Sequence, residues 1–286
     1  PFANIAHGCN SLIATSFARR IADYVVTEAG FGADLGMEKF IDIKSRNLGI
    51  LPSAVVVVAS IRALKSHGGV EKANLKTENL EALKKGIANL EKHTENVKLY
   101  HLPYVIALNR FDSDSIDELD FVMNCAKENN HPLALSEVFG KGSLGGIDLA
   151  KQVVKLTEMK TDPKASQLYS LDESIKTKIE KIAINIYGAK EVTYTDKALS
   201  QIDNFNRLGW NNLAICMAKT PLSLTDNPKI IGRPKDFTIS IREFKPSIGA
   251  GFLVALTGDV MTMPGLPKTG AYENMDVVDG KIVGLF

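Results

Sequence analysis

The sequence predicts an α/β fold in which helices flank a parallel sheet, followed by a smaller α+β domain. Two apolar runs, 55–59 and 104–108, have the composition of strands that are buried on both faces. A helical pattern lies between them, so the connection is long enough for a parallel crossover. Beyond residue 160 the order changes to two helices followed by short strands. We therefore expect one domain over residues 1–160 and a second over 161–286.

Local signals in the first half place helices and further strands around these runs. Short runs at 24–26 and 132–135 are predicted strands, since β-branched and apolar residues dominate them. Apolar residues recur at helical spacing from 80 to 90, which predicts an amphipathic helix. Ser115 and Glu118 have the spacing of a capping box, which predicts the start of another helix.

The second half has its own start and stop signals. Ser170 and Glu173 have capping-box spacing and predict a helix that ends near Gly188. A further helix is expected from Thr195 to Gly209. Strands are then predicted near residues 214–217, 237–242 and 251–256.

Composition narrows the class of protein. The chain has 286 residues, 45% of them apolar, and a formal net charge of +1 with both signs interspersed, so charge does not indicate a nucleic-acid partner. The longest apolar run, 54–59, is too short to cross a bilayer, and the first residues do not resemble a signal peptide. The three cysteines form no Cys-x-x-Cys pair. We expect a cytoplasmic protein with no membrane or nucleic-acid partner.

Polar or glycine-rich loops follow each predicted strand of the first domain. These loops are 27–36, 60–69, 109–112 and 136–142. Ligands of open parallel sheets bind beyond the carboxyl ends of the strands, so we expect the four loops to converge on one cleft.

The loops carry side chains with suitable chemistry. Basic side chains that can hold phosphate or carboxylate are Arg62, Lys65, Arg110 and Lys141. Acidic side chains that could bind a metal or position an amine are Glu28, Asp34 and Glu137. Phe111 and Phe139 could offer aromatic faces to a flat ring. The ordinary alternatives are that the charged residues are solvated and that the phenylalanines belong to the core.

Glycine patterns give a partial signal. His67 precedes Gly68 and Gly69, where a backbone can approach a ligand closely. Gly30, Gly32 and Gly36 are misspaced for a dinucleotide fingerprint, which leaves a nicotinamide-dependent oxidoreductase as a weak alternative. The pattern Gly-x-x-x-x-Gly-Lys-Ser/Thr is absent from the sequence. Anion-binding residues without a phosphate-binding loop indicate that only part of the binding site is present.

Four long strings resemble formate–tetrahydrofolate ligases. They are residues 1–11, 25–36, 58–69 and the ending from 257–267 to 284–286. The resemblance runs along the whole chain. It implies that the parallel sheet is P-loop-NTPase-like.

The resemblance also implies a reaction of one-carbon metabolism. Such ligases use ATP, with Mg²⁺, to activate formate as formyl phosphate, and the amine of tetrahydrofolate then attacks it to give 10-formyltetrahydrofolate. The family responds to monovalent cations (K⁺ or NH₄⁺) and forms homotetramers. The physical logic is that phosphate is a good leaving group, while the protein aligns the reactants and stabilises charge.

The resemblance implies a stacking role for the aromatic pair. Arg62, Lys65 and His67 belong to the family signature, and their substrate-facing role is inferred, as are the roles of Asn4 and His7. Folate binding is assigned to Phe111, Phe139 and Glu137, with Phe139 standing where relatives commonly have Trp. Catalysis is assigned to Arg62, Lys65 and His67. The vicinity of the nucleotide and formyl phosphate is assigned to Asn4, His7, Glu28, Asp34, Asn109 and Arg110. No residue is assigned to a metal.

The resemblance finally concerns the extent of the chain. Relatives are about twice as long, and their N-terminal half carries the phosphate loop. We expect this chain to be a C-terminal portion that is inactive without that half. The alternative is a non-catalytic folate-binding or assembly module.

Overall fold

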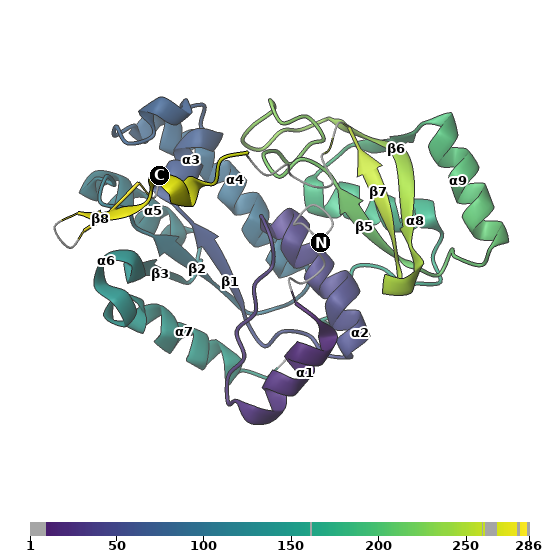
Figure 1. Cartoon of the computed structure of the whole chain (residues 1–286), viewed down its shortest axis with the longest axis horizontal. Helices are drawn as coiled ribbons and strands as arrows, with labels where there is room; N and C mark the ends of the chain where they lie inside the picture. Colours follow the sequence, from purple (N-terminus) through teal and green to yellow (C-terminus); the bar gives the residue numbers. More distant parts are fainter. Residues whose placement is uncertain (1–9, 161, 259, 261–267, 279–280, 285–286) are drawn as a thin grey trace.

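The computed structural model of the chain describes residues 10–160, 162–258, 260, 268–278 and 281–284. Two sheets and their helices form a mixed α/β architecture, as the sequence predicts (Figure 1). The helices are α1 (Leu12–Ile21), α2 (Arg46–Leu48), α3 (Ile61–His67), α4 (Leu80–Leu99), α5 (Ile116–Glu128), α6 (Val138–Lys141), α7 (Ile147–Thr157), α8 (Ile175–Lys181) and α9 (Asp196–Arg207). The strands are β1 (Val55–Ala59), β2 (Tyr104–Asn109), β3 (Leu133–Ser136), β4 (Glu191–Tyr194), β5 (Ala214–Ala218), β6 (Thr238–Ser247), β7 (Phe252–Thr257), β8 (Asp276–Val278) and β9 (Lys281–Val283).

The first sheet is wholly parallel, in the order β1-β2-β3. Its pairing places Ala59 opposite Leu108, and Asn109 opposite Ser136, so the carboxyl ends of the three strands lie at one edge. The predicted parallel sheet is confirmed. The predicted strand at 24–26 is wrong, because this segment has no strand partner among the described residues and Val26 is exposed to solvent.

Helices α3 and α4 pack closely beside this sheet, and two glycines make the close approach possible. A Cβ built on Gly86 would lie 1.8 Å from the Leu64 carbonyl oxygen, and one on Gly68 would lie 1.8 Å from the Ala82 carbonyl oxygen. Neither position can accept a side chain without moving a helix backbone. The close contact fixes α3, which follows β1, against the longest helix of the chain.

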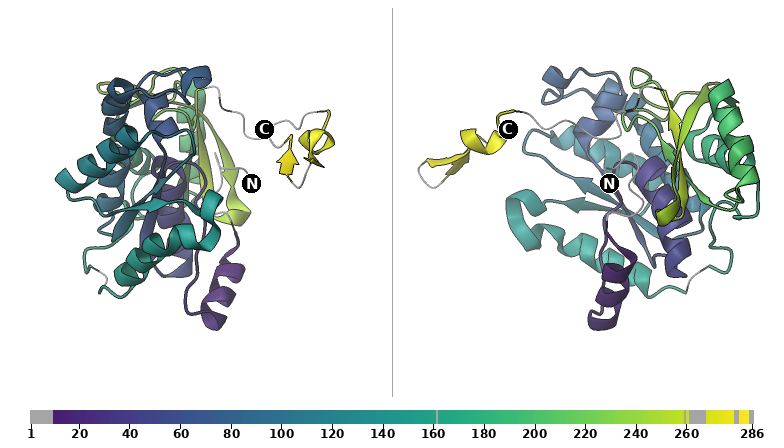
Figure 2. Two further views of the ribbon diagram at one scale, coloured as in Figure 1. Left: turned by 90° about the vertical axis from the view of Figure 1, so that its left-hand side faces the viewer. Right: turned by 45° about the vertical axis from the view of Figure 1, so that its right-hand side comes forward.

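The second sheet is mixed, in the order β4-β6-β7-β5. Strands β6 and β7 are antiparallel, while β4 and β5 run parallel to β6 and β7 respectively. The predicted helix after residue 170 begins one turn later than expected, because Ser174 rather than Ser170 accepts the capping hydrogen bond, from the Thr177 N–H. Figure 2 shows the short β8–β9 hairpin set apart from both sheets.

A helical segment over residues 33–48 lies between the two sheets (Figure 1). It contains two π-helical stretches, Ala33–Met37 and Phe40–Ser45, and ends at Gly49 in the left-handed conformation. π-Helical turns occur frequently at functional sites. Both of these stretches are largely buried, including several of their charged side chains.

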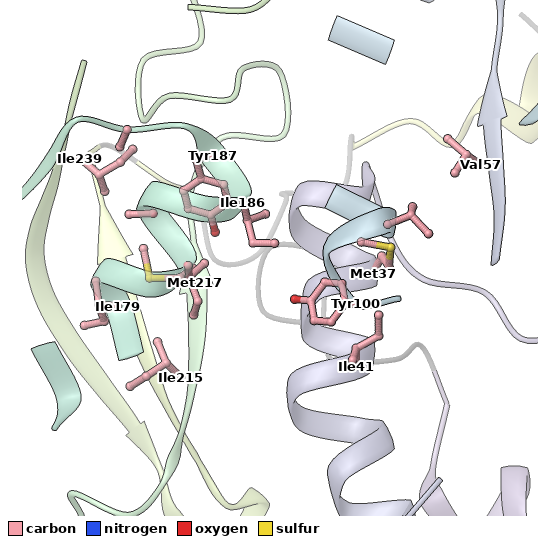
Figure 3. Close-up of a cluster of buried hydrophobic side chains, with 14 of the residues drawn as sticks. Met37, Ile41, Val57, Tyr100, Ile179, Ile186, Tyr187, Ile215, Met217 and Ile239 are labelled. Carbon is pink, nitrogen blue, oxygen red and sulfur yellow. The ribbon is translucent and has the colours of Figure 1, made fainter. Parts of the chain in front are cut away.

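Both sheets contribute to one large cluster of buried apolar side chains that includes Met37 and Ile41 of this segment, and a second cluster joins Ile43 to β5 and β7. Figure 3 shows Met37 and Ile41 with Tyr100 on one side, and Ile186, Tyr187 and Met217 on the other. The division of the chain at residue 160 therefore remains a prediction.

Candidate functional site

The loops that follow β1, β2 and β3 begin at one edge of the parallel sheet, as expected. Ser60 caps α3 directly after β1, because its hydroxyl accepts a hydrogen bond from the Ala63 N–H. The loop after β2 begins at Arg110, and the loop after β3 begins at Glu137. The loop at 27–36 does not follow a strand. Its last residues, 33–36, form the start of the helical segment 33–48, which sets its position.

An ion-pair network joins the loop after β2 to the loop after β3. The Arg110 Nη1 and the Glu137 Oε1 are 2.8 Å apart, and the Lys141 Nζ lies 2.6 Å from the Glu137 Oε2. The Arg110 N–H also donates to the Ser136 carbonyl oxygen at 3.0 Å. The hydrogen bond from Lys141 and that from Arg110 lower the pKa of the Glu137 carboxyl, which keeps it ionised. Two cations and a carboxylate thus stand at the ends of β2 and β3.

Phe111 stands beside this network, with the Arg62 guanidinium over its ring. The Arg62 Cζ is 4.1 Å from the ring centroid, and the Arg62 Nη2 donates to the Ser113 Oγ at 3.0 Å. A short turn fixes the phenylalanine, because its N–H donates to the Asp114 Oδ2 at 2.8 Å. Phe111 is half-buried.

Phe139 differs from Phe111 in its exposure. It lies in the single turn of α6, where 87% of its surface is exposed, and the neighbouring Leu144 is also exposed. A single exposed apolar ring is common on protein surfaces, so its exposure alone does not identify a binding site. The sequence predicted two aromatic side chains at neighbouring strand ends, and the structure places both there.

The three residues assigned to catalysis on α3 point in different directions. Arg62 contacts Phe111, while Lys65 is fully buried and forms an ion pair of 2.8 Å with Glu118. The His67 Nδ1 accepts a hydrogen bond from the Gly232 N–H at 3.2 Å, and burial lowers the pKa of the imidazole. The structure therefore brings Arg62, but neither Lys65 nor His67, to the ring of Phe111.

The residues assigned to the nucleotide vicinity are similarly divided. Asn109 is half-buried at the end of β2 beside Arg110, whereas Glu28 is exposed. Asp34 is buried, and its Oδ2 lies 2.7 Å from the Lys219 Nζ. Asn4 and His7 lie outside the described residues.

Lys219 is a site neighbour that sequence reasoning missed. It follows the fully buried strand β5, and its ammonium also donates to the carbonyl oxygens of Thr220 and Ser223. Its position directly after an apolar strand is a weak sequence signal from which Lys219 could have been predicted as a site residue. The ion pair with Asp34 connects the second sheet to the 27–36 loop.

The proposed metal ions have no evident protein site in the part of the chain that the structure describes. There, no group of three or more His, Cys, Asp or Glu side chains is arranged to hold an ion. The same described residues contain no helix that is long and apolar enough to cross a membrane.

The fold and the site together define an α/β protein with cations and aromatic rings at the carboxyl edge of a parallel sheet, where ligands of such sheets bind. A model of one enzyme family, formate–tetrahydrofolate ligase, matches residues 1–286. The chain belongs to this family. The family is one of ligases that join formate to tetrahydrofolate, with ATP as a further substrate.

Proposed function

We propose that this chain supplies the tetrahydrofolate side of an ATP-dependent formate–tetrahydrofolate ligase. The observation that carries the proposal is the convergence of Arg110, Phe111 and Glu137 at the ends of β2 and β3 in a member of this family. Phe111 and Phe139 would stack on the pterin ring, and Glu137 would position the attacking amine. The ligation would proceed through formyl phosphate to 10-formyltetrahydrofolate.

The chemistry explains why such a site needs cations. Formate is a poor acyl donor, and transfer of a phosphoryl group from ATP gives formyl phosphate and ADP. The tetrahydrofolate amine then attacks the formyl carbon. The C–N bond forms, the C–O bond to phosphate breaks, and the amine loses its proton. Arg110 uses only Nη1 toward Glu137 among the described residues, so its other N–H donors can hold the phosphate oxygens.

The first sheet supports the further proposal that another polypeptide portion completes the site. Strand β1 pairs only with β2 among the described residues, and 71% of the Val58 surface is exposed. Parallel sheets normally have both faces covered, and a free edge offers unpaired backbone groups to another strand. Helix α1 also exposes Ile13 and Phe17. We propose that the portion carrying the phosphate loop covers these surfaces.

Other properties are proposed from family resemblance alone. Mg²⁺ would accompany ATP, K⁺ or NH₄⁺ would support activity, and the complete enzyme would be a cytoplasmic homotetramer. Arg62, Lys65 and His67, together with Glu28, Asp34 and Asn109, remain proposed contributors to catalysis or to the nucleotide vicinity.

The test is to measure tetrahydrofolate binding and formyltetrahydrofolate synthesis with and without a co-expressed N-terminal half. We expect binding in both cases and synthesis only with the companion half. Binding without synthesis in either case would favour the alternative, a non-catalytic folate-binding or assembly module. The absence of both binding and synthesis, with and without the companion half, would refute the proposal.

A further inference from the structure

Glu118 lies on the buried side of α5, where its carboxylate joins three helices. The Oε1 accepts hydrogen bonds from the Lys65 Nζ at 2.8 Å and from the Asn79 N–H at 2.9 Å. The Oε2 accepts one from the Ser115 N–H at 3.4 Å, which completes the predicted capping box. Asn79 and Ser115 are the N-caps of α4 and α5, and Lys65 belongs to α3. One buried carboxylate therefore fixes the relative positions of three helix ends.

Lys65 gives this anchor its strength. Neither its side chain nor that of Glu118 is exposed, and the Lys65 Nζ also donates to the Thr77 carbonyl oxygen at 2.8 Å. A buried pair with satisfied hydrogen bonds favours one geometry, because removing either partner leaves an uncompensated charge. The pair is thus suited to holding α3 in a defined position.

Arg62 stands one turn before Lys65 on the same helix, so the anchor also sets its position. Its guanidinium covers one face of Phe111, and the Ser113 Oγ holds the Nη2. Phe111 is itself part of the turn that leads into the Ser115 cap. A flat ligand that stacks on Phe111 must take the face that Arg62 does not cover.

We propose that Glu118 is a positioning residue for the folate platform. Through Lys65 and the Ser115 cap, it holds Arg62 behind Phe111, so that the guanidinium, the phenyl ring and the pterin form a three-layer stack. The inference rests on the proposed function, because it requires the pterin to bind at Phe111. A cation behind the ring draws electron density away from the opposite face, which favours an electron-rich tetrahydropterin there. Holding the ring in place also reduces the entropy lost on binding.

The primary experiment measures tetrahydrofolate affinity of the chain and its variants by titration calorimetry. We expect Glu118→Gln to weaken binding about tenfold and Ser113→Ala about threefold, the scale of losing one ordinary hydrogen bond. Ser113→Thr keeps the hydroxyl and should bind as the unaltered chain does. Asp120→Asn, a change of an exposed carboxylate on the same helix, is the matched control and should have no effect.

A spectroscopic reading separates positioning from general stability. The ring current of Phe111 should displace the Arg62 Nε–H resonance, and Phe111→Leu identifies that resonance. Glu118→Gln should move it toward the value of an exposed arginine, while Asp120→Asn should not. Lower thermal stability in Glu118→Gln without this movement would overturn the inference.

The remaining outcomes are also decisive. If the unaltered chain binds tetrahydrofolate and every variant binds equally well, the inference is wrong while the proposed function stands. If the unaltered chain binds tetrahydrofolate neither alone nor with the co-expressed N-terminal half, both are overturned. Should Glu118→Gln fail to fold, the comparison of Ser113→Ala with Ser113→Thr decides, since neither touches the buried ion pair. Equal affinity of these two variants would overturn the inference.

Discussion

Replacing Lys219 with methionine should destabilise the protein strongly, because the substitution leaves a buried carboxylate without its cation. The Lys219 ammonium is fully buried, 2.7 Å from the Asp34 Oδ2 and 3.1 Å from the Thr220 carbonyl oxygen. Two other charged or titratable groups act on Asp34, namely Lys39 and His93, and the His93 Nδ1 lies 4.0 Å from the Oδ1. Burial lowers the pKa of this imidazole, so it is a poor substitute for the ammonium.

The expected magnitude follows from the burial of both partners. Removing one partner of a buried ion pair costs about 3–5 kcal/mol of unfolding free energy. The double variant Asp34→Asn/Lys219→Met leaves no uncompensated charge. It should lose less than the sum of the two single variants, with a coupling free energy of about 1–3 kcal/mol.

The contribution of the Asp34–Lys219 ion pair to the free energy of unfolding depends on pH in a defined direction. Burial alone would raise the pKa of Asp34, but Lys219 lowers it, and the net result is a pKa below its ordinary value. The ion pair therefore stabilises the fold above the unfolded-state pKa, and this contribution is lost as the pH falls through the folded-state pKa. Without Lys219, burial should raise the pKa of Asp34. The difference between Lys219→Met and the unaltered protein should accordingly shrink on acidification.

The assay is urea unfolding followed by circular dichroism at pH 7 and pH 4. Lys84→Met is the control, since its partner Glu81 is exposed and surface ion pairs contribute little. The reasoning is refuted if Lys219→Met unfolds at the same urea concentration as the unaltered protein at pH 7. A double variant that loses the full sum of the single effects would refute the coupling.

Three further predictions concern the platform and the helix packing. Phe111→Ala should weaken tetrahydrofolate binding by about 1–3 kcal/mol, the scale of one stacking platform, and unchanged affinity in a folded variant would exclude this role. Phe139→Trp should tighten binding without changing the urea midpoint, since residue 139 is largely exposed and Trp offers a larger face; calorimetry showing weaker binding would contradict this. Gly86→Ala should destabilise the protein by about 1–3 kcal/mol or more, because the new Cβ would lie 1.8 Å from the Leu64 carbonyl oxygen. This cost should outweigh the better helix propensity of alanine. A variant that is more stable than the unaltered protein in urea unfolding would show that α3 and α4 can separate freely.

The parallel sheet was predictable because its strands carry strong local signals. The apolar run at 55–59 and the capping box of Ser115 with Glu118 each have one favourable local structure, and both occur as expected. The run at 24–26 has an equally suitable composition but forms no strand. A strand requires a neighbour for its backbone hydrogen bonds, and composition does not show whether a neighbour is present.

The candidate site was predictable only as a set of loops. The rule that ligands bind beyond the carboxyl ends of parallel strands brought Arg110, Phe111 and Glu137 to one edge, where the structure places them. The same rule could not distinguish Arg62 from Lys65, which stand on one helix. Arg62 and Lys65 are three residues apart, so about 100° of rotation per residue leaves them only about 60° apart around the helix axis. Their tertiary contacts separate them, because Arg62 lies over the Phe111 ring while Lys65 is buried beside Glu118.

The family, the alternation of strands and helices, and the chemistry available at the sheet edge can all be read from local strings and local spacing. The pairing of the buried charged groups depends on the three-dimensional fold. Asp34 with Lys219 and Lys65 with Glu118 are far apart along the chain but meet in the interior. There, a charge is stable only beside its partner, so long-range packing rather than residue type assigns its role.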